Sequence, residues 1–107
     1  MLFVVHSYIN QAMPKRIYRK TRYTKLPEGA VLVTRGSRWG NPFRIVEHGG
    51  EYTREESVRL YREYILQKIK ENPAYYDLSL LRGKDLACSC KPEELCHGDV
   101  LLELANG

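Results

Sequence analysis

The stretch Thr53-Arg-Glu-Glu-Ser-Val-Arg-Leu-Tyr-Arg-Glu-Tyr-Ile-Leu-Gln-Lys-Ile-Lys-Glu71 decides the fold of this chain. Thr53 and Glu56 have the spacing of a capping box, so a helix is expected to begin here, and Pro73 sets its end near Glu71. Apolar side chains recur at helical spacing along it and predict a stripe that covers a sheet. The stripe consists of Val58, Tyr61, Ile65 and Ile69, with Leu60 and Tyr64 beside them.

The segments on either side of this helix have the character of strands. Residues 30–34 (AVLVT) precede it and residues 85–90 (DLACSC) follow it, both as short apolar runs. Residues 74–81 are typical of a short helix closed near Gly83, and residues 98–105 of a final helix. The order strand, helix, strand, helix is that of a βαβ unit. We therefore expect a single α/β domain over residues 1–107, with a small, mostly parallel sheet of three to four strands and helices packed on it.

The N-terminal region is less regular. Residues 2–5 (LFVV) are typical of a short buried strand, and another short strand is expected around Arg16–Tyr18 within the basic, otherwise irregular segment 7–25. The longest apolar runs fall far short of the roughly 18 residues that a membrane span needs, and the start does not have the pattern of a signal peptide. We expect a cytoplasmic protein without a membrane partner.

Charge is distributed unevenly along the chain. Residues 1–44 carry nine Lys or Arg and one acid, whereas residues 45–107 carry eight Lys or Arg and twelve acids. A basic first half indicates a surface that meets a phosphate, a nucleotide or a nucleic acid, although a solvated basic arm has the same composition. Tyrosines alternate with cations within residues 15–25, as in surfaces that bind single strands. The candidate nucleic-acid-binding residues are Arg16, Arg19, Lys20 and Arg22.

The loop from Arg35 to Phe43 (RGSRWGNPF) follows the strand at residues 30–34 directly. Its arginines carry planar, fork-shaped donors that suit phosphate or carboxylate, and its tryptophan can stack on a ring. The asparagine can pair with a base edge or hold the turn before Pro42. A rigid loop plugged by its aromatic side chains is the structural alternative. The candidate ligand-binding residues are Arg35, Ser37, Arg38, Trp39 and Asn41.

The segment from Cys88 to Asp99 holds all three cysteines of the chain. Three interpretations compete: a zinc site, a reactive or redox thiol, and cysteines packed as small apolar residues. The zinc interpretation meets two objections: the spacing of the ligands along the chain is not a standard one, and adjacent residues on a helix diverge by about 100°, which separates Cys96 from His97. The candidate metal ligands are Cys88, Cys90, Cys96 and His97, and the candidate catalytic residues are His97, Asp99 and Cys96.

Both segments leave the carboxyl ends of predicted strands, where sites of parallel sheets lie. Arg35 directly follows Thr34, and Lys91 directly follows Cys90. We therefore expect the loop from Arg35 to Phe43 and the segment from Cys88 to Asp99 to form one site.

Several motifs in order resemble a prokaryotic and phage family, domain of unknown function 4326. They are residues 36–43 with WGNPF at their centre, residues 53–56 followed by YREY at 61–64, and LRGKDLACSC at 81–90 followed by CHGDVL at 96–101. The resemblance covers about residues 15–106, although many relatives carry an aromatic residue where this chain has Ser89. It implies one fold unit with these motifs as its signature, in the cytoplasm of a prokaryote or of an infected host cell, and it supplies no established activity.

The leading hypothesis is a nucleotide- or nucleic-acid-directed protein whose ligand is held by Arg35, Arg38 and Asn41. Both an enzyme and a non-catalytic protein fit these residues. The alternatives are a non-catalytic, zinc-stabilised nucleic-acid-binding module and a small phage-type protein that binds and blocks a partner. A homodimer formed through an edge strand is a further expectation.

Overall fold

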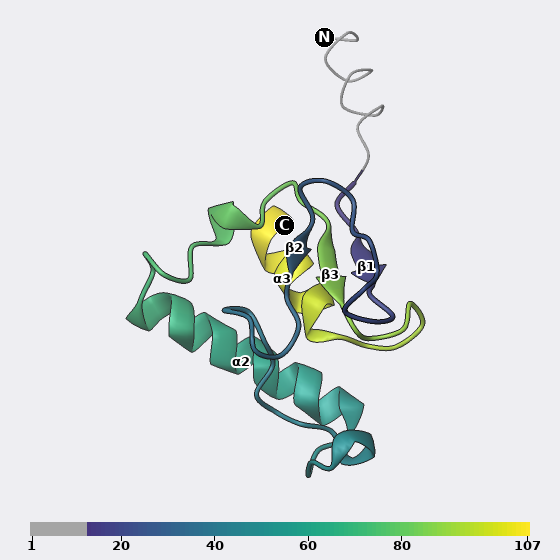
Figure 1. Ribbon diagram of the computed structural model, residues 1–107. Coiled ribbons are helices and arrows are strands. Elements are labelled where there is room, and N and C mark those ends of the chain that lie inside the picture. Colours follow the sequence, from purple (N-terminus) through teal and green to yellow (C-terminus); the bar gives the residue numbers. More distant parts are fainter. Residues whose placement is uncertain (1–12) are drawn as a thin grey trace, which may run out of the picture.

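The computed structural model describes residues 13–107 (Figure 1). The strand predicted at residues 2–5 and the first part of the basic segment 7–25 lie outside the described residues.

Three parallel strands form the sheet, in the order β1-β3-β2. They are β1 (Arg16–Tyr18), β2 (Val31–Leu32) and β3 (Leu86–Cys88), and the central β3 is fully buried. This confirms the small parallel α/β sheet that the sequence predicts. The strands at β2 and β3 are shorter than predicted, because the chain turns at Thr34–Ser37 after one and at Ser89 after the other.

The long helix α2 (Arg54–Glu71) forms where the sequence predicts it. The Thr53 hydroxyl accepts from the Glu56 N–H, and the Glu56 carboxylate accepts from the Thr53 N–H at 3.1 Å, so the capping box is confirmed. The apolar stripe of α2 was expected to cover the sheet, and here the structure differs. The helix packs mainly on α3 (His97–Asn106) rather than on the sheet, because α3 itself lies against β1 and β3 (Figure 1).

The core lies where α2, α3 and the sheet meet. Its largest fully buried side chains are Tyr61, Ile65, Leu81, Leu86, Leu101 and Val33. The Tyr61 hydroxyl donates to the Trp39 carbonyl at 2.6 Å, which satisfies a buried polar group and ties the loop before α2 to the core. Both aromatic residues are therefore structural elements of this core.

Residues 74–81 do not form the predicted helix. They contain turns and one 3₁₀ helix, η2 (Leu78–Leu80), because the Asp77 carboxylate accepts from the Ser79 N–H and so caps a single short turn. A second 3₁₀ helix, η1 (Val46–His48), lies between β2 and α2. The last helix α3 begins at His97, one residue before the predicted start.

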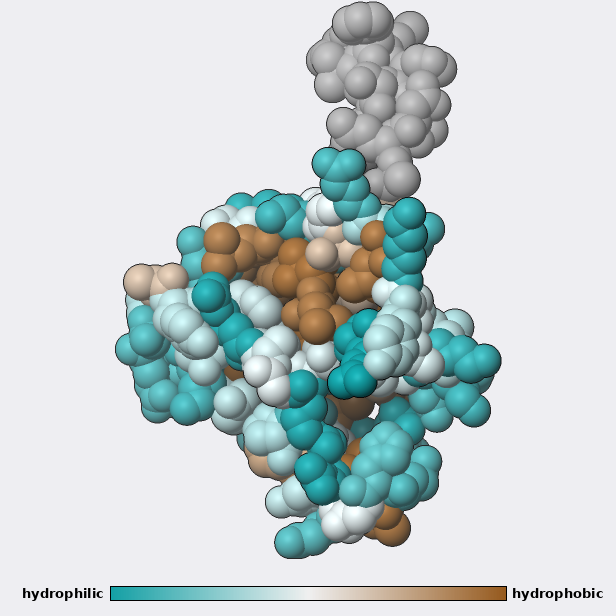
Figure 2. Space-filling view, viewed as in Figure 1, coloured by the Kyte–Doolittle hydropathy of each residue, from teal (hydrophilic) through white to brown (hydrophobic). Residues whose placement is uncertain are grey.

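The surface combines apolar and charged areas. On the face seen in Figure 2, apolar side chains gather over the region of the strands, with hydrophilic side chains around them. Leu32 of the edge strand β2 is among the exposed apolar residues. Association through this edge remains a prediction. Within residues 13–107 no helix has both the length and the apolar character that crossing a membrane requires.

Candidate functional site

A pocket of about 570 Å³ lies at the carboxyl ends of all three strands, and we call it the strand-end pocket. Because the strands are parallel, the residues that follow each of them meet at one edge of the sheet. The helix α2 closes one side with Arg54, Ser57 and Val58. The strand ends contribute Tyr18, Arg19, Thr34, Arg35, Ser89, Cys90 and Lys91.

The pocket also brings the two predicted segments together. Arg35, Asn41 and Phe43 line it from the first loop, and Cys88, Cys90, Cys96 and His97 line it from the second. The two segments therefore lie together at the strand ends, as the sequence predicts.

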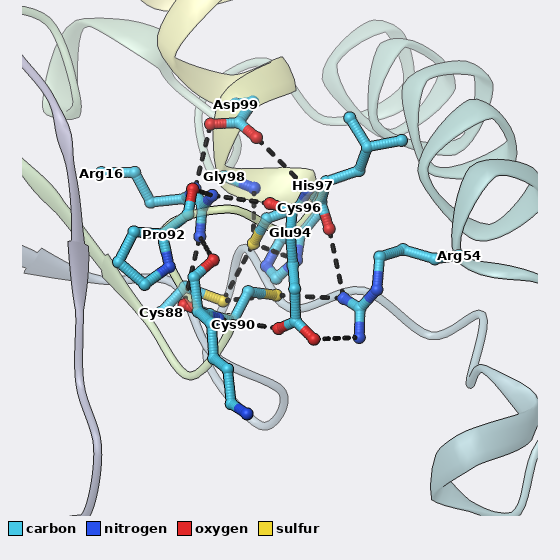
Figure 3. Close-up of polar contacts among 12 residues, drawn as sticks. Arg16, Arg54, Cys88, Cys90, Pro92, Glu94, Cys96, His97, Gly98 and Asp99 are labelled. Atoms are coloured by element: carbon cyan, nitrogen blue, oxygen red, sulfur yellow. Dashed lines mark hydrogen bonds and ion pairs between the residues drawn. The ribbon is translucent and has the colours of Figure 1, made fainter.

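Three free thiols, which we call the thiol cluster, line the pocket and lie close together (Figure 3). The sulfur of Cys88 lies 3.7 Å from that of Cys90 and 3.2 Å from that of Cys96. Hydrogen bonds with Cys90 and Cys96 hold the pKa of Cys88 well below its ordinary value. Hydrogen bonds with Cys88 raise the pKa of Cys90 and Cys96.

His97 lies beside the thiol cluster and is buried. Its Nε2 is 2.5 Å from the Val33 carbonyl oxygen, which can only accept, so Nε2 carries the proton and donates it. The other nitrogen, Nδ1, lies 3.8 Å from the Cys96 sulfur. Burial lowers the pKa of His97 and so favours the neutral imidazole, in which Nδ1 carries a lone pair on the side of the Cys96 sulfur.

Cys88, Cys96 and His97, which we call the Cys/His group, could hold a metal ion, because one ligand atom of each lies within 4.8 Å of the others. The objection that Cys96 and His97 diverge on a helix is wrong. Cys96 is the N-cap of α3, with extended φ and ψ of −148° and 147°, so the two residues do not have helical spacing.

An unusual capping box holds Cys96 in place. Its sulfur accepts from the Gly98 N–H at 3.4 Å, and the Asp99 carboxylate accepts from the Cys96 N–H at 3.2 Å. The same carboxylate binds the Arg16 Nε at 3.0 Å. Asp99 is not among the residues that line the strand-end pocket, so its contacts are those of a residue that positions Cys96.

The guanidinium of Arg16 is enclosed by the segment that carries the cysteines (Figure 3). Nε bonds Asp99, while Nη1 donates to the carbonyls of Cys90 and Lys91, both at 3.2 Å. Nη2 donates to the carbonyls of Pro92 and Glu94, at 3.1 and 2.7 Å. All its N–H groups are therefore used inside the protein, and the side chain is only 8% exposed. This placement leaves no donor for a nucleic acid.

The other three candidate cations of the basic arm (residues 15–25) differ in position. Arg19 lines the strand-end pocket, whereas Lys20 and Arg22 lie outside it. Arg22 stacks on the exposed ring of Tyr23 and donates to its hydroxyl at 2.7 Å. Of the four cations predicted to contact nucleic acid, Arg19 alone is a pocket residue.

Three of the five candidate ligand-binding residues of the Arg35–Phe43 loop, namely Ser37, Arg38 and Trp39, lie outside the strand-end pocket. Ser37 donates to the Thr34 carbonyl at 2.6 Å and so shapes the turn. Arg38 stacks on the Tyr75 ring and donates to the Tyr75 carbonyl. Trp39 is buried in the core.

Asn41 lines the pocket but is also held by internal hydrogen bonds. Its amide donates to the Ser57 hydroxyl at 2.9 Å, and its carbonyl accepts from the Phe43 N–H at 2.8 Å. The Ser57 hydroxyl in turn donates to the Phe43 carbonyl at 2.5 Å. This closed network docks the loop on the first turns of α2.

Sequence reasoning missed Arg54, which lines the pocket from the first turn of α2. Its guanidinium donates to the Leu95 carbonyl at 3.2 Å and to the Glu94 carboxylate at 3.2 Å, with the Cys90 sulfur 3.8 Å away. A signal was present in the sequence. A cation at the start of a helix interacts unfavourably with the helix dipole. An arginine at this position therefore indicates a contact with a group outside the helix.

The fold and the pocket define a class of small α/β protein: a three-stranded parallel sheet with a cysteine- and histidine-lined pocket at its strand ends. The chain belongs to the family described as domain of unknown function (DUF4326), which matches residues 17–107. It is 34% identical over 77 residues to an uncharacterized 12.4 kDa protein from the nrdA-td intergenic region of Enterobacteria phage T4. That match covers 71% of this chain and 67% of the phage protein. No solved structure matches the chain.

Proposed function

We propose that this protein binds a phosphate-bearing ligand, a nucleotide or a segment of nucleic acid, in the strand-end pocket. One observation carries the proposal. Arg19, Arg35 and Lys91 follow the three strands at one edge of the sheet, and all three line the pocket. Within residues 13–107 none of their side chains makes a hydrogen bond or an ion pair.

Cations without internal partners suit this ligand on physical grounds. The acids that line the pocket, Glu47 and Glu94, both lie within ion-pair distance of Arg54, so they offset that guanidinium rather than the three free cations. Guanidinium forks bind phosphate oxygens through paired charged hydrogen bonds. The volume of about 570 Å³ is typical of a small-molecule site.

The part of the pocket that the cysteines and His97 line is the end where chemistry would take place. The Nδ1 atom of His97 is an acceptor, and the Cys96 thiol lies next to it. In the protein without a metal ion we assign proton acceptance to Nδ1 of His97, and to Asp99 the role of positioning Cys96 through the N-cap hydrogen bond. An enzyme that acts on the bound nucleotide would use this end, and a binding protein would use the cations alone.

Arg35→Ala is expected to weaken binding of a fluorescent nucleoside triphosphate roughly 10- to 100-fold, since a charged hydrogen bond contributes about 1.5–3 kcal/mol. The melting temperature should stay nearly unchanged, because Arg35 is exposed. Fluorescence anisotropy and thermal denaturation measure the two quantities.

Arg38→Ala is the matched control, because it removes the same charge from the same loop outside the pocket. Equal losses of affinity in the two variants would indicate diffuse attraction and would contradict the proposed site. No binding of nucleotide or single-stranded oligonucleotide by the wild type would contradict the proposed function itself.

A second candidate function is a non-catalytic nucleic-acid-binding module stabilised by zinc, and the Cys/His group favours it. Its contacts would lie on the exposed part of the basic arm, where Lys20 and Arg22 are found. Affinity for a single-stranded oligonucleotide should then fall steeply with salt, and Lys20→Ala should reduce the slope by about one unit. Salt titrations that give a flat dependence would count against this candidate, as would an affinity that Arg35→Ala alone abolishes.

A further inference from the structure

We infer that Cys88, Cys96 and His97 form a site for a zinc-type divalent metal ion with three protein ligands, and that the fourth coordination position faces the strand-end pocket. The inference deepens the proposed function and rests on it in one respect. The open position would meet an oxygen or nitrogen atom of the same ligand that the pocket cations hold.

The separations between the ligand atoms are within about half an ångström of those around a tetrahedral ion. Zinc–sulfur bonds of about 2.3 Å and a zinc–nitrogen bond of about 2.0 Å place two sulfurs about 3.8 Å apart and a sulfur and a nitrogen about 3.5 Å apart. The Cys88 and Cys96 sulfurs are 3.2 Å apart, and the Cys96 sulfur is 3.8 Å from Nδ1 of His97. One ligand atom of each of the three residues lies within 4.8 Å of the others. An ion therefore needs only small adjustments of side chains that already converge.

The histidine makes the kind of hydrogen bond that orients an imidazole toward a metal ion. A metal-bound imidazole usually donates its other N–H to a carbonyl or a carboxylate, which sets the tautomer and the direction of the ring. Here Nε2 donates to the Val33 carbonyl, and the ring packs edge-on against Tyr61 with 4.9 Å between the centroids. The free electron pair of Nδ1 is thus on the side of the cysteines.

The segment that carries the ligands is held independently of any ion. Arg16 binds four of its carbonyls and the Asp99 carboxylate, and Asp99 binds the Cys96 N–H. The strand β3 places Cys88 in the middle of the sheet. Because these supports order the ligands on folding, little conformational entropy remains to be lost on metal binding.

Cys90 is the residue that separates an open site from a closed one. Its sulfur lies 3.7 Å from that of Cys88 but outside the mutually close Cys/His group. It lies 3.8 Å from Nη1 of Arg54 (Figure 3), and both residues line the pocket. Three protein ligands with a fourth position for water or substrate is the arrangement of catalytic zinc sites, whereas structural sites are closed by a fourth side chain. We therefore assign Cys90 to the pocket wall.

The test begins with the metal content of the full-length, tag-free protein, purified under reducing conditions and washed with a weak chelator. About one zinc ion per chain is expected. After replacement by cobalt, the wild type should show a thiolate-to-cobalt charge-transfer band together with the visible bands of a tetrahedral ion. Absence of both bound zinc and the charge-transfer band in the wild type would overturn the inference, even if every cysteine variant failed to fold.

Variants identify the ligands. Cys96→Ser should lose the ion, and the matched control Cys90→Ser, which changes a neighbouring thiol of the same cluster, should keep it with an unchanged charge-transfer band. Loss of the ion in Cys90→Ser as complete as in Cys96→Ser would overturn the three-ligand assignment.

Inorganic phosphate tests the open position. Added to the cobalt-loaded wild type, it should shift the visible bands, and Arg35→Ala should require a higher phosphate concentration for the same shift. Bands that neither phosphate nor azide moves would overturn the open position. Metal content is measured without nucleotide, so a protein that holds the ion but binds no nucleotide would contradict the proposed function alone.

Discussion

Replacing Arg16 with alanine is expected to lower the free energy of unfolding by about 3 kcal/mol, because the half-exposed Asp99 carboxylate and four backbone carbonyls lose their shared partner together. The guanidinium is 8% exposed and donates to the backbone at four places between Cys90 and Glu94 as well as to Asp99. The loss is a large fraction of the roughly 5–15 kcal/mol that stabilises a typical domain. Urea denaturation followed by circular dichroism measures it.

Arg19→Ala is the matched control, since Arg19 makes no side-chain hydrogen bond within the described residues and lies three positions along the same arm. Its effect should stay within about 0.5 kcal/mol. Arg16→Lys should be intermediate, because an ammonium keeps the charge but does not have the planar fork that reaches five acceptors. If Arg16→Ala is as mild as Arg19→Ala, the segment from Cys90 to Glu94 is held by other contacts.

Asn41→Ala is expected to cost about 2 kcal/mol of stability, because it removes two hydrogen bonds and leaves the Phe43 N–H without a partner. The Ser57 hydroxyl, which is buried, would lose its donor from Asn41 as well. Thermal and urea denaturation both report the change, and affinity for nucleotide should fall only as far as the loop loosens.

Asn41→Asp separates the two hydrogen bonds. The carboxylate still accepts from Phe43 but has no N–H to give to Ser57, so its cost should lie between zero and that of alanine. A variant Asn41→Ala of normal stability that no longer binds nucleotide would instead make Asn41 a direct ligand contact, as the sequence analysis predicts.

Local features were predictable because their cause is local. The capping box at Thr53 and Glu56 predicts the start of α2 and the proline at position 73 predicts its end, and both bounds are confirmed. The residues after Thr34 and Cys90 were expected at one edge because parallel strands bring their carboxyl ends together. The failure at residues 74–81 has a local cause too, since Asp77 caps one turn and not a helix.

The roles of side chains within the site were less predictable. Arg16 and Arg35 look alike in the sequence, as arginines in basic segments at the start of one short strand and just past the end of another. One is enclosed by carbonyls more than 70 positions away, and the other is exposed at the pocket. Trp39 was a candidate for stacking on a ligand, but its side chain is buried in the core and its carbonyl accepts from the Tyr61 hydroxyl. Cys96 resembled a helix residue but is an N-cap.

The amino-acid pattern thus specified the α/β class, the long helix, the strand ends that carry the site, and the two segments that meet there. The fold alone selected the residues that face the pocket: Arg19, Arg35 and Arg54 rather than Arg16, Arg22 and Arg38. The physical reason is the distance along the chain over which each kind of interaction acts. Helix periodicity, caps and turns arise between residues a few positions apart, whereas the partner of a guanidinium or a thiol depends on how β1, β3 and α3 pack, and that packing is a property of the whole chain.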